Sequence, residues 1–436
     1  MMKFKRSDFP QDFIFGTATS SYQIEGHSFG GAGPTHWDTF AAKPGKILDG
    51  TDGAIACDHY NRWQEDLDLI KDAGFDSYRF STSWARVMPE GRGAVNQEGL
   101  DFYERLVDGM LARGIKPMAT LYHWEMPAAL DALGGWQNAD VANWFAEFTD
   151  VIAKRLGDRL FSTATINEPW CVSWLSHFEG HHAPGLQDIK ATARAMHHVL
   201  KAHGKSVQML RQNGVKDVGI VCNFEGTMPA DDSVESARAA ARYEAIYNRF
   251  FLQGIFEGTY PEEVLEGLGP HLPAGWQDDM ALIQQPLDWV GVNYYTAKAF
   301  RETDGPWPSC EAVSTGADTT HMNWEIHPDH LTKLLKWIAD SYTKDLPLYV
   351  TENGMAGEHT LNDQDRISYL NGHVLAAKSA MEQGVPLSGY TFWSLMDNYE
   401  WAFGYAERFG LVHVDFDTLE RTPKASYLAL RDAMSQ

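Results

Sequence analysis

Short apolar runs alternate with longer amphipathic stretches along the whole chain. Eight of the runs are mostly apolar on both faces, which is typical of strands buried in a parallel sheet. They cover residues 13–24, 77–81, 115–122, 160–166, 218–224, 287–294, 348–351 and 387–392. The pattern therefore predicts eight parallel strands, spread from one end of the chain to the other.

The stretches between these runs carry apolar residues at helical spacing. Trp63, Leu67 and Ile70 share one face of a helix that we expect to end near Gly74, and Gly114 follows a second predicted helix. Residues 331–338 repeat the pattern, and further helices are predicted at 98–112, 140–155, 190–212, 234–256, 363–383 and 425–433. Helices are thus expected between the strands and after the last one.

Eight strands alternating with helices is the element count of a (β/α)8 barrel. We expect residues 1–436 to form a single α/β domain of this TIM-barrel type. A doubly wound open sheet is the alternative, but no G-x-G-x-x-G motif follows the first strand. Three insertions after strands, 25–58, 169–187 and 296–326, are expected to be irregular loops on the rim of the active site.

The charge of the chain excludes some classes of partner. Lys and Arg number 36 against 59 Asp and Glu, a net charge of −23. This balance argues against binding to nucleic acid or to an acidic membrane surface. The chain also contains 15 Trp residues, and 12% of its residues are aromatic, which favours a ring-shaped ligand such as a carbohydrate.

The cysteine pattern indicates a reducing environment. Cys57, Cys171, Cys222 and Cys310 lie far apart in the sequence and form no zinc or redox motif. The N-terminus has no signal-peptide pattern, and no window is apolar enough for a membrane span. We therefore expect a soluble cytoplasmic protein with reduced thiols, whose oligomeric state stays open, a homo-oligomer included.

Two clusters of polar residues are interpreted as structural. Five histidines fall in or after the second insertion: His177, His181, His182, His197 and His198. No H-E-x-x-H or carboxylate pattern accompanies them, so we expect no metal site. The acidic residues Glu65, Asp66 and Asp68 are expected to form the solvated face of the first long helix.

Two predicted strands end in a glutamate flanked by an asparagine. Asn167-Glu168-Pro169 closes the fourth strand, and Glu352-Asn353 closes the seventh, 352 − 168 = 184 residues later. Pro169 stops its strand and is expected to keep Glu168 extended, with the side chain facing a pocket. An isolated N-E-P motif most often marks an exposed turn. The second glutamate at a strand end is what favours a functional site over that interpretation.

The carboxyl ends of all strands converge on one pocket in a barrel. The polar and aromatic residues at or just beyond the predicted ends are Gln23, Arg79, His123, Trp124, Asn167, Glu168, Asn293, Tyr295, Glu352, Trp393, Glu400 and Trp401. Two facing carboxylates suit glycosidic bond cleavage, in which one protonates the leaving oxygen and the other attacks or activates water. Arg79 and Tyr295 would keep one carboxylate ionised, but the spacing leaves open which one.

Four of these residues also have a structural alternative. Arg79 could belong to an ordinary buried ion pair, and His123 could be a hydrogen-bonded structural histidine. Trp393 and Trp401 could be core aromatics.

The chain resembles the β-glucosidases of glycoside hydrolase family 1. The similar segments occur in family order over almost the whole chain: 13–26 (FIFGTATSSYQIEG), 59–89, 121–127, 165–169 (TINEP), 291–295, 349–354 (YVTENG) and 389–416. The resemblance implies a retaining exo-β-glucosidase that acts on short oligosaccharides, as in cellulose degradation, or on aryl and alkyl β-glucosides. It also implies side activity on β-galactosides and β-fucosides, and no cofactor.

The same resemblance assigns roles to the residues. It implies that Glu168 is the acid/base and Glu352 the nucleophile, with the carboxyl groups about 5–5.5 Å apart. Asn167 would hold the sugar 2-hydroxyl, and Arg79 and Tyr295 would orient Glu352. The remaining implied contacts to the substrate come from Gln23, His123, Trp124, Asn293, Trp324, Trp393, Glu400, Trp401 and Phe409, of which Trp324 faces the leaving group.

Glu400 narrows the implied substrate further. A carboxylate facing the sugar 4- and 6-hydroxyls would repel a 6-phosphate, and relatives acting on phosphorylated sugars carry a Ser–Lys–Tyr arrangement in this region. Here Glu400-Trp401 stands instead, so we expect a β-glucoside without phosphate. A catalytically inactive sugar-binding barrel is disfavoured because both glutamates are present, whereas a transglycosylase sharing the covalent intermediate stays open.

Overall fold

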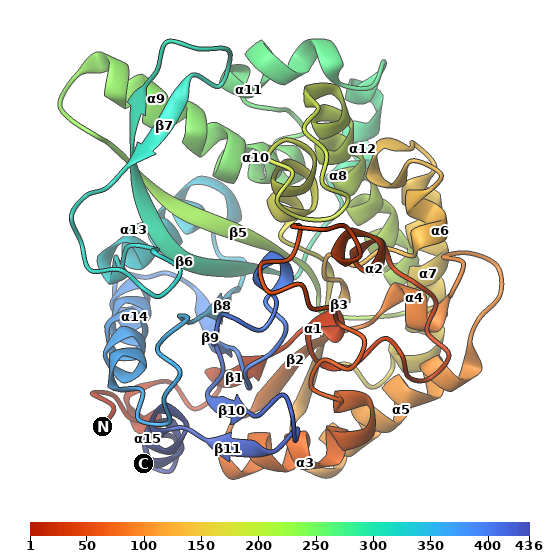
Figure 1. Ribbon diagram of the computed structural model, residues 1–436. Helices are drawn as coiled ribbons and strands as arrows, with labels where there is room; N and C mark the ends of the chain where they lie inside the picture. The colour runs from red at the N-terminus through yellow and green to blue at the C-terminus, as the bar shows by residue number, and fades with distance from the viewer.

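The computed structural model describes residues 1–436, and its centre is a closed barrel of eight parallel strands (Figure 1). Neighbours pair in the order β1, β2, β3, β4, β5, β6, β8 and β9, and β9 pairs with β1 to close the ring. Their bounds are β1 Ile14–Ala18, β2 Ser77–Ser81, β3 Lys116–Tyr122, β4 Ser162–Asn167, β5 Val218–Pro229, β6 Trp289–Glu302, β8 Leu348–Asn353 and β9 Leu387–Trp393. The predicted (β/α)8 barrel is confirmed.

Helices surround the barrel between successive strands (Figure 1). The long ones are α3 His59–Asp72, α5 Gln97–Ala112, α7 Val141–Leu156, α8 Ile189–Gln212, α9 Val234–Glu244, α13 Pro328–Ile338, α14 Gln364–Glu382 and α15 Ala425–Met434. The short ones are α1 Ser21–Ile24, α2 His36–Ala41, α4 Trp84–Val87, α6 Ala128–Asp131, α10 Phe250–Phe256, α11 Glu262–Leu268 and α12 Met280–Ile283. None of these helices has the length and apolar character needed to cross a membrane.

Several helix ends follow from local chemistry. Gly74 and Gly114 follow α3 and α5 with φ of 75° and 72°, the left-handed conformation that commonly ends a helix. Asp188 begins α8, because its carboxylate accepts the Ala191 N–H at 2.8 Å. The predicted helix 234–256 is interrupted by a π-helical segment, Ala245–Arg249, between α9 and α10.

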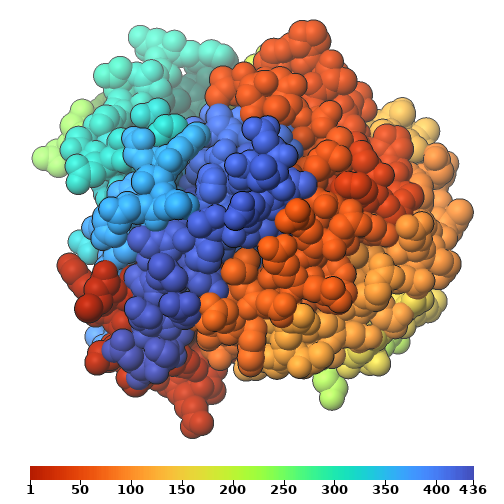
Figure 2. Space-filling view, turned by 60° about the horizontal axis from the view of Figure 1, so that its bottom comes forward, coloured from red at the N-terminus to blue at the C-terminus, as the bar shows by residue number.

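One hydrophobic core joins the two ends of the chain. A cluster of 98 buried residues extends from Met2 to Met434. The two termini lie close together at the lower left of Figure 1, and in Figure 2 the blue C-terminal residues lie against red and orange N-terminal ones. The C-terminal helix α15 packs against α14 and α3, where the Tyr427 hydroxyl donates to the Leu69 carbonyl at 2.7 Å.

The first predicted strand is too long. β1 ends at Ala18, and Ser21–Ile24 form the helical turn α1. The hydroxyl of Ser81 accepts the backbone N–H of Ser21 at 2.7 Å, which holds the start of this turn against β2. The turn buries the Gln23 side chain beside the strand ends.

The third insertion is partly regular, contrary to prediction. β6 runs on to Glu302, and β7 (Cys310–Val313) pairs with it antiparallel. β5 also continues to Pro229 beside β6, so the three strands form a ribbon that leaves the barrel at the upper left of Figure 1. Pairing satisfies backbone groups that an irregular segment would leave to water.

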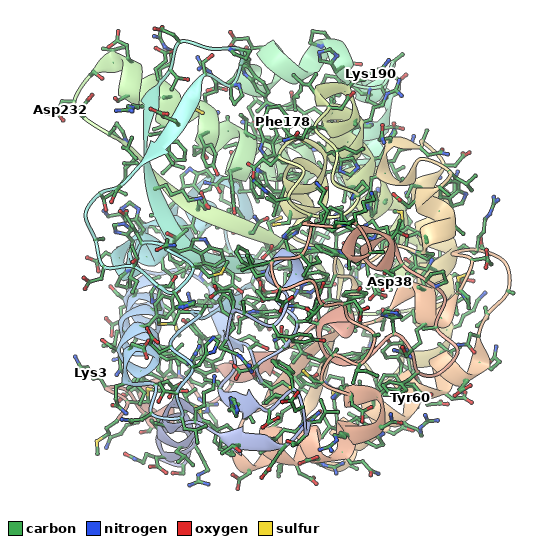
Figure 3. The ribbon with its side chains drawn as sticks, in the orientation of Figure 1. Lys3, Asp38, Tyr60, Phe178, Lys190 and Asp232 are labelled. Atoms are coloured by element: carbon green, nitrogen blue, oxygen red, sulfur yellow. The ribbon has the colours of Figure 1, made fainter.

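The first two insertions pack together over the rim of the barrel. They share a second small core with residues 399–401, made of Tyr22, Trp37, Phe40, Ile47, Ala183, Tyr399 and Trp401. Figure 3 labels Asp38 of the first insertion and Phe178 of the second. The carboxylate of Asp38 accepts the Tyr22 hydroxyl at 2.8 Å, which ties the first insertion to α1.

One interpretation of the acidic run is wrong. Glu65 and Asp68 face solvent as expected, but Asp66 is fully buried. Its carboxylate accepts from Arg421 Nε at 2.9 Å and lies 2.7 Å from Nδ1 of His59. A distant cationic partner stabilises this buried charge, and the local sequence contains no sign of it.

Candidate active site

A cavity of about 380 Å³ opens at the carboxyl ends of the strands. Ten of the residues predicted from the sequence line it: His123, Trp124, Glu168, Tyr295, Trp324, Glu352, Trp393, Glu400, Trp401 and Phe409. They come from β3, β4, β6, β8, β9 and the segments that follow these strands. Closure of the barrel brings together residues that are far apart in sequence.

The other four predicted residues lie beneath this lining. Gln23, Asn167 and Asn293 are 0% exposed, and Arg79 is 2% exposed. Their side chains hydrogen-bond to lining residues from below, so they act as the floor of the cavity.

Glu352 is held by a cation and a hydroxyl. Its Oε1 accepts from Arg79 Nη1 at 2.6 Å, and its Oε2 accepts from the Tyr295 hydroxyl at 2.7 Å. Burial raises the pKa of Glu352, whereas the guanidinium and the hydroxyl oppose that rise. Arg79 and Tyr295 thus both contact Glu352 and not Glu168. The spacing in the sequence had left open which of the two glutamates they would contact.

Glu168 is held by uncharged donors only. Its Oε1 accepts from Asn293 Nδ2 at 2.6 Å, and its Oε2 accepts from the Cys171 thiol at 3.1 Å. Burial, and then the charge of Glu352, raise the pKa of Glu168. Glu352 therefore contacts a cation directly and Glu168 does not. A directly bound cation is the contact that most favours the ionised form.

The backbone at Glu168 differs from the prediction. β4 ends at Asn167, and Glu168 has a φ of 53°, in the left-handed region, so it is not extended. Its N–H donates to the Val221 carbonyl at 2.8 Å, while its own carbonyl accepts from Val172 at 3.1 Å. Pro169 disfavours the right-handed helical conformation at Glu168, and the strand pairing and the following turn select the left-handed one.

Asn167 fixes the tautomer of His123. Its Oδ1 accepts from Arg79 Nη2 at 2.6 Å and from Asn293 Nδ2 at 3.1 Å, so its Nδ2 is the group that faces Nε2 of His123 at 3.2 Å. His123 Nε2 is then an acceptor, and the ring proton sits on Nδ1, which has no protein partner. Burial and the nearby charge of Arg79 hold the pKa of His123 well below its usual value. The Nδ1–H of the neutral ring is therefore buried without a hydrogen-bond partner in the protein.

Aromatic rings form one side of the cavity, which we call the tryptophan wall: His123, Trp124, Trp393 and Trp401. The His123 ring is stacked with Trp393 at 5.7 Å and with Trp401 at 6.2 Å between centroids. Trp393 and Trp401 are 5% and 2% exposed. They are core aromatics and lining residues at once, so the two interpretations of these side chains are compatible.

Glu400 adds a carboxyl group beside this wall. Its Oε2 accepts from Gln23 Nε2 at 3.3 Å, and the same nitrogen donates to Asn398 Oδ1 at 2.8 Å. Burial and the charges of Glu352 and Glu407 raise the pKa of Glu400 to about 8. A ligand that donates hydrogen bonds to Glu400 would therefore favour its ionised form.

A second side of the cavity was not predicted. We call it the charged wall: Glu179, Glu225, Tyr243 and Lys298. Lys298 Nζ donates to Glu225 Oε1 at 2.7 Å, and the Tyr243 hydroxyl donates to Glu225 Oε2 at 3.1 Å. Glu225 directly follows the predicted strand 218–224, so the strand-end rule could have found it, whereas Lys298 carried no such signal.

Further lining residues lacked a prediction for this site. They are Trp170, Cys171, Leu175, His181, His182, Asn223, Phe224, Tyr247, Thr296, Met322, Ala402 and Phe403. Seven of the twelve belong to the second insertion, 169–187, or to the third, 296–326. Their positions depend on the path of segments that were expected to be irregular.

The five histidines do not converge on one point. His177 Nδ1 lies 2.7 Å from the Ser176 hydroxyl, His197 lies 3.1 Å from Asp279, and His198 donates to the Trp136 carbonyl at 2.9 Å. Of the other two, His181 is exposed and His182 is buried at the cavity. No group of three or more His, Cys, Asp or Glu side chains is arranged to hold a metal ion.

Comparisons with known proteins agree over the whole chain. The sequence model of "Glycosyl hydrolase family 1" matches residues 5–435. Beta-glucosidase A of Thermotoga maritima is 44% identical over 430 residues, covering 96% of each chain, and a bifunctional beta-D-glucosidase/beta-D-fucosidase of Bifidobacterium breve is 40% identical over 449 residues, again covering 96% of each. A family 1 β-glucosidase of Thermotoga maritima, solved in complex with isofagomine lactam, superposes with a TM-score of 0.95 at 43% identity, covering 99% of this chain and 98% of that one.

Proposed function

The chain belongs to glycosyl hydrolase family 1, and from this membership and the geometry of its two buried glutamates we propose that it is a retaining exo-β-glucosidase. Its substrates are the terminal non-reducing β-D-glucosyl residues of short oligosaccharides and of aryl or alkyl β-glucosides. One observation carries the division of roles: Arg79 and Tyr295 contact Glu352, whereas only uncharged donors contact Glu168.

In the first step, a carboxylate oxygen of Glu352 forms a bond to the anomeric carbon while the bond from that carbon to the leaving oxygen breaks. Glu168 gives its proton to the leaving oxygen. The cation at Glu352 favours the ionised nucleophile, and burial beside that charge favours the protonated acid. A glycosyl ester and a neutral alcohol result.

In the second step, Glu168 takes a proton from water, whose oxygen attacks the anomeric carbon and releases Glu352. Esterification removes the charge on Glu352 that had raised the pKa of Glu168, so Glu168 is ready to act as a base. Two inversions at the same carbon retain its configuration. Both steps use side chains and water alone, and the proposal requires no cofactor.

The tryptophan wall is proposed to bind the terminal sugar. Trp393 would lie under the ring, and His123 would contact a sugar hydroxyl from the same wall. Asn167 would reach the 2-hydroxyl through Nδ2, whose only protein partner is the 3.2 Å contact with His123. Gln23 and Glu400 would take the 4- and 6-hydroxyls. The bifunctional relative of Bifidobacterium breve supports a secondary activity on β-fucosides, and β-galactosides are proposed beside them.

A glucoside without a 6-phosphate is the proposed substrate. Lys298 is the only Lys or Arg in the lining, and its ammonium group is already paired with Glu225 at 2.7 Å. Glu400 brings a carboxyl group to the place where the 6-substituent would lie. A phosphorylated sugar would therefore meet negative charge and find no free cation.

We also propose that the chain is one catalytic domain, that it works in a reducing compartment and that it acts on cello-oligosaccharides. A core that extends from Met2 to Met434 supports one catalytic domain. Four unpaired cysteines, three of them buried, support a reducing compartment such as the cytoplasm. Action on cello-oligosaccharides is tested by comparing kcat/KM for cellobiose, longer cello-oligosaccharides, lactose and aryl β-glucosides.

Azide rescue tests the two catalytic roles. Glu168→Ala should still form the glycosyl-enzyme from aryl glucosides with good leaving groups, because those need no proton. Added azide should then speed its breakdown and give the β-glucosyl azide. Glu352→Ala should instead give the α-azide from an activated β-glucoside. A β-azide from Glu352→Ala and an α-azide from Glu168→Ala would reverse the assignment.

A further inference from the structure

Cys171 lies three residues after Glu168, in the π-helical segment Cys171–Leu175 that follows β4. The chain turns directly after the strand, because the Val172 N–H donates to the Glu168 carbonyl at 3.1 Å. This turn brings the Cys171 thiol back to the Glu168 carboxyl group. The side chain is buried and lines the cavity, yet the proposed mechanism gives it no role.

Each oxygen of the Glu168 carboxyl has one protein donor. Asn293 Nδ2 lies 2.6 Å from Oε1, and Cys171 Sγ lies 3.1 Å from Oε2. Arg79 is engaged by Glu352 and Asn167. The orientation of the carboxyl therefore depends on one amide and one thiol, and the thiol is the weaker donor of the two.

The second contact of the thiol fixes the direction of its hydrogen bond. Asn223 Nδ2 donates to Cys171 Sγ at 3.6 Å and to the Tyr247 hydroxyl at 2.8 Å. The sulfur accepts on this side, so its own hydrogen is left for Glu168. Burial, and then the charge of Glu168, raise the pKa of the Cys171 thiol well above its usual value, and the thiol stays protonated.

The ionisable groups around this contact come from several elements. The charges that act on Glu168 or Cys171 belong to Arg79 on β2, Glu179 in the second insertion and Glu352 on β8. The charge of Glu168 in turn raises the pKa of Cys222, Tyr247, Tyr295 and Glu400. Only Arg79 among them is a cation. Both donors to Glu168, the Asn293 amide and the Cys171 thiol, can be changed without changing a charge, but Asn293 also bonds to Asn167 and Thr351. Cys171 is therefore the donor whose replacement disturbs fewer other contacts of the site.

We propose that Cys171 is a positioning residue for Glu168, which it holds through a weak hydrogen bond to Oε2 that serves both halves of the reaction. The inference rests on the proposed acid/base role of Glu168. A donor at Oε2 stabilises the carboxylate, which helps Glu168 release its proton to the leaving group. The same donor weakens Glu168 as a base toward water. A thiol gives less of both effects than a hydroxyl would, so neither step is strongly favoured over the other.

Two substitutions at this position should act in opposite directions. Cys171→Ser supplies a stronger donor and should move the basic limb of the kcat/KM pH profile to lower pH. Cys171→Ala removes the donor and should move the limb to higher pH. Each shift should be about half a pH unit to one unit, measured with an aryl β-glucoside that has a poor leaving group.

Controls separate this proposal from simple packing. Cys222→Ala removes another buried thiol, one with no hydrogen bond to Glu168, and should leave the limb unmoved. Cys171→Ser and Cys171→Ala shifts of the same sign, or no shift in folded variants with wild-type Tm, would overturn the positioning role. Glu168→Gln should abolish the basic limb. If the basic limb survived in Glu168→Gln, the acid/base assignment and this inference would both be lost. If Glu168→Gln lost the basic limb while Cys171→Ser and Cys171→Ala left it unmoved, this inference alone would be overturned.

Discussion

The tryptophan wall and the charged wall face the same cavity but come from different parts of the fold. His123, Trp124, Trp393 and Trp401 stand at or just beyond the ends of β3 and β9. Glu225 and Lys298 lie on the extensions of β5 and β6 beyond the barrel, Tyr243 lies on α9, and Glu179 lies in the second insertion. One wall belongs to the barrel itself and the other to the segments added to it.

This difference in origin matches a difference in environment. The rings of His123, Trp393 and Trp401 are almost fully buried, whereas the side chain of Lys298 is 35% exposed. A dry aromatic surface beside the two catalytic glutamates suits the sugar that every substrate shares. A partly solvated ion pair suits a group that varies from one substrate to the next. Substitutions in the tryptophan wall, or beneath it, should therefore lower kcat/KM for all glucosides alike. The effect of substitutions in the charged wall should depend on the leaving group.

Arg79→Met should have the largest effect. Glu352 loses its cation, so its pKa rises by about 1–3 units and its ionised fraction at neutral pH falls, with kcat/KM reduced by about 10²-fold or more for every glucoside. The acidic limb of the pH profile should move to higher pH, because the nucleophile must be ionised. Arg86→Met is the matched control, since Arg86 forms a buried ion pair with Glu25 at 2.9 Å and does not touch Glu352. A loss from Arg79→Met that varied with the leaving group would contradict the comparison of the two walls.

Glu400→Ala should have the next largest effect. Two charge-assisted hydrogen bonds to the sugar are lost, which reduces kcat/KM by about 10²–10³-fold whatever the leaving group. The ratio of glucoside to fucoside activity should also fall, because a fucoside lacks the 6-hydroxyl. Steady-state rates on matched nitrophenyl glycosides measure both. Glu302→Ala serves as control, because Glu302 pairs with Arg238 at 2.6 Å and does not line the cavity.

The barrel and the tryptophan wall could be predicted because they depend on local pattern. β2 is observed at Ser77–Ser81, the range predicted from its apolar run, and a barrel places every strand end at one pocket. Arg79 was noticed because a charged residue in such a run needs a buried partner, and Glu352 is that partner. Because the strand ends of a barrel converge on one pocket, residues that are far apart in sequence could be predicted to form one site.

The rest depends on features that no local pattern contains. The contact of Cys171 with Glu168 requires the left-handed backbone at Glu168, opposite to the extended conformation that Pro169 suggested. The position of Lys298 follows a register shift between β5 and β6 after Phe224. Such features result from pairing with distant strands, which is also why the insertion 296–326 was read as irregular.

Lys298→Met should separate the two walls. Glu225 would lose its cation, and kcat/KM for cellobiose should fall by about 10-fold while aryl glucosides change by less than about 2-fold. Arg238→Met is a matched control, because Arg238 on α9 pairs at 2.6 Å with Glu302, the last residue of β6, and neither residue lines the cavity. Equal losses on cellobiose and aryl glucosides would show that the charged wall acts on the shared sugar.

Trp324→Ala should have the smallest effect and the sharpest dependence on the leaving group. The Trp324 ring lies 5.5 Å from Tyr295 and 6.1 Å from Phe409 between centroids, at the cavity but off the tryptophan wall. Loss of an aromatic contact should lower kcat/KM by about 3–10-fold for aryl glucosides and less for methyl glucoside. Trp337→Ala, which removes a half-buried ring on α13 packed edge-on against Tyr342, should change neither rate. If methyl glucoside lost as much as the aryl substrates, Trp324 would belong with the residues that hold the sugar, and the division between the walls would have to be redrawn.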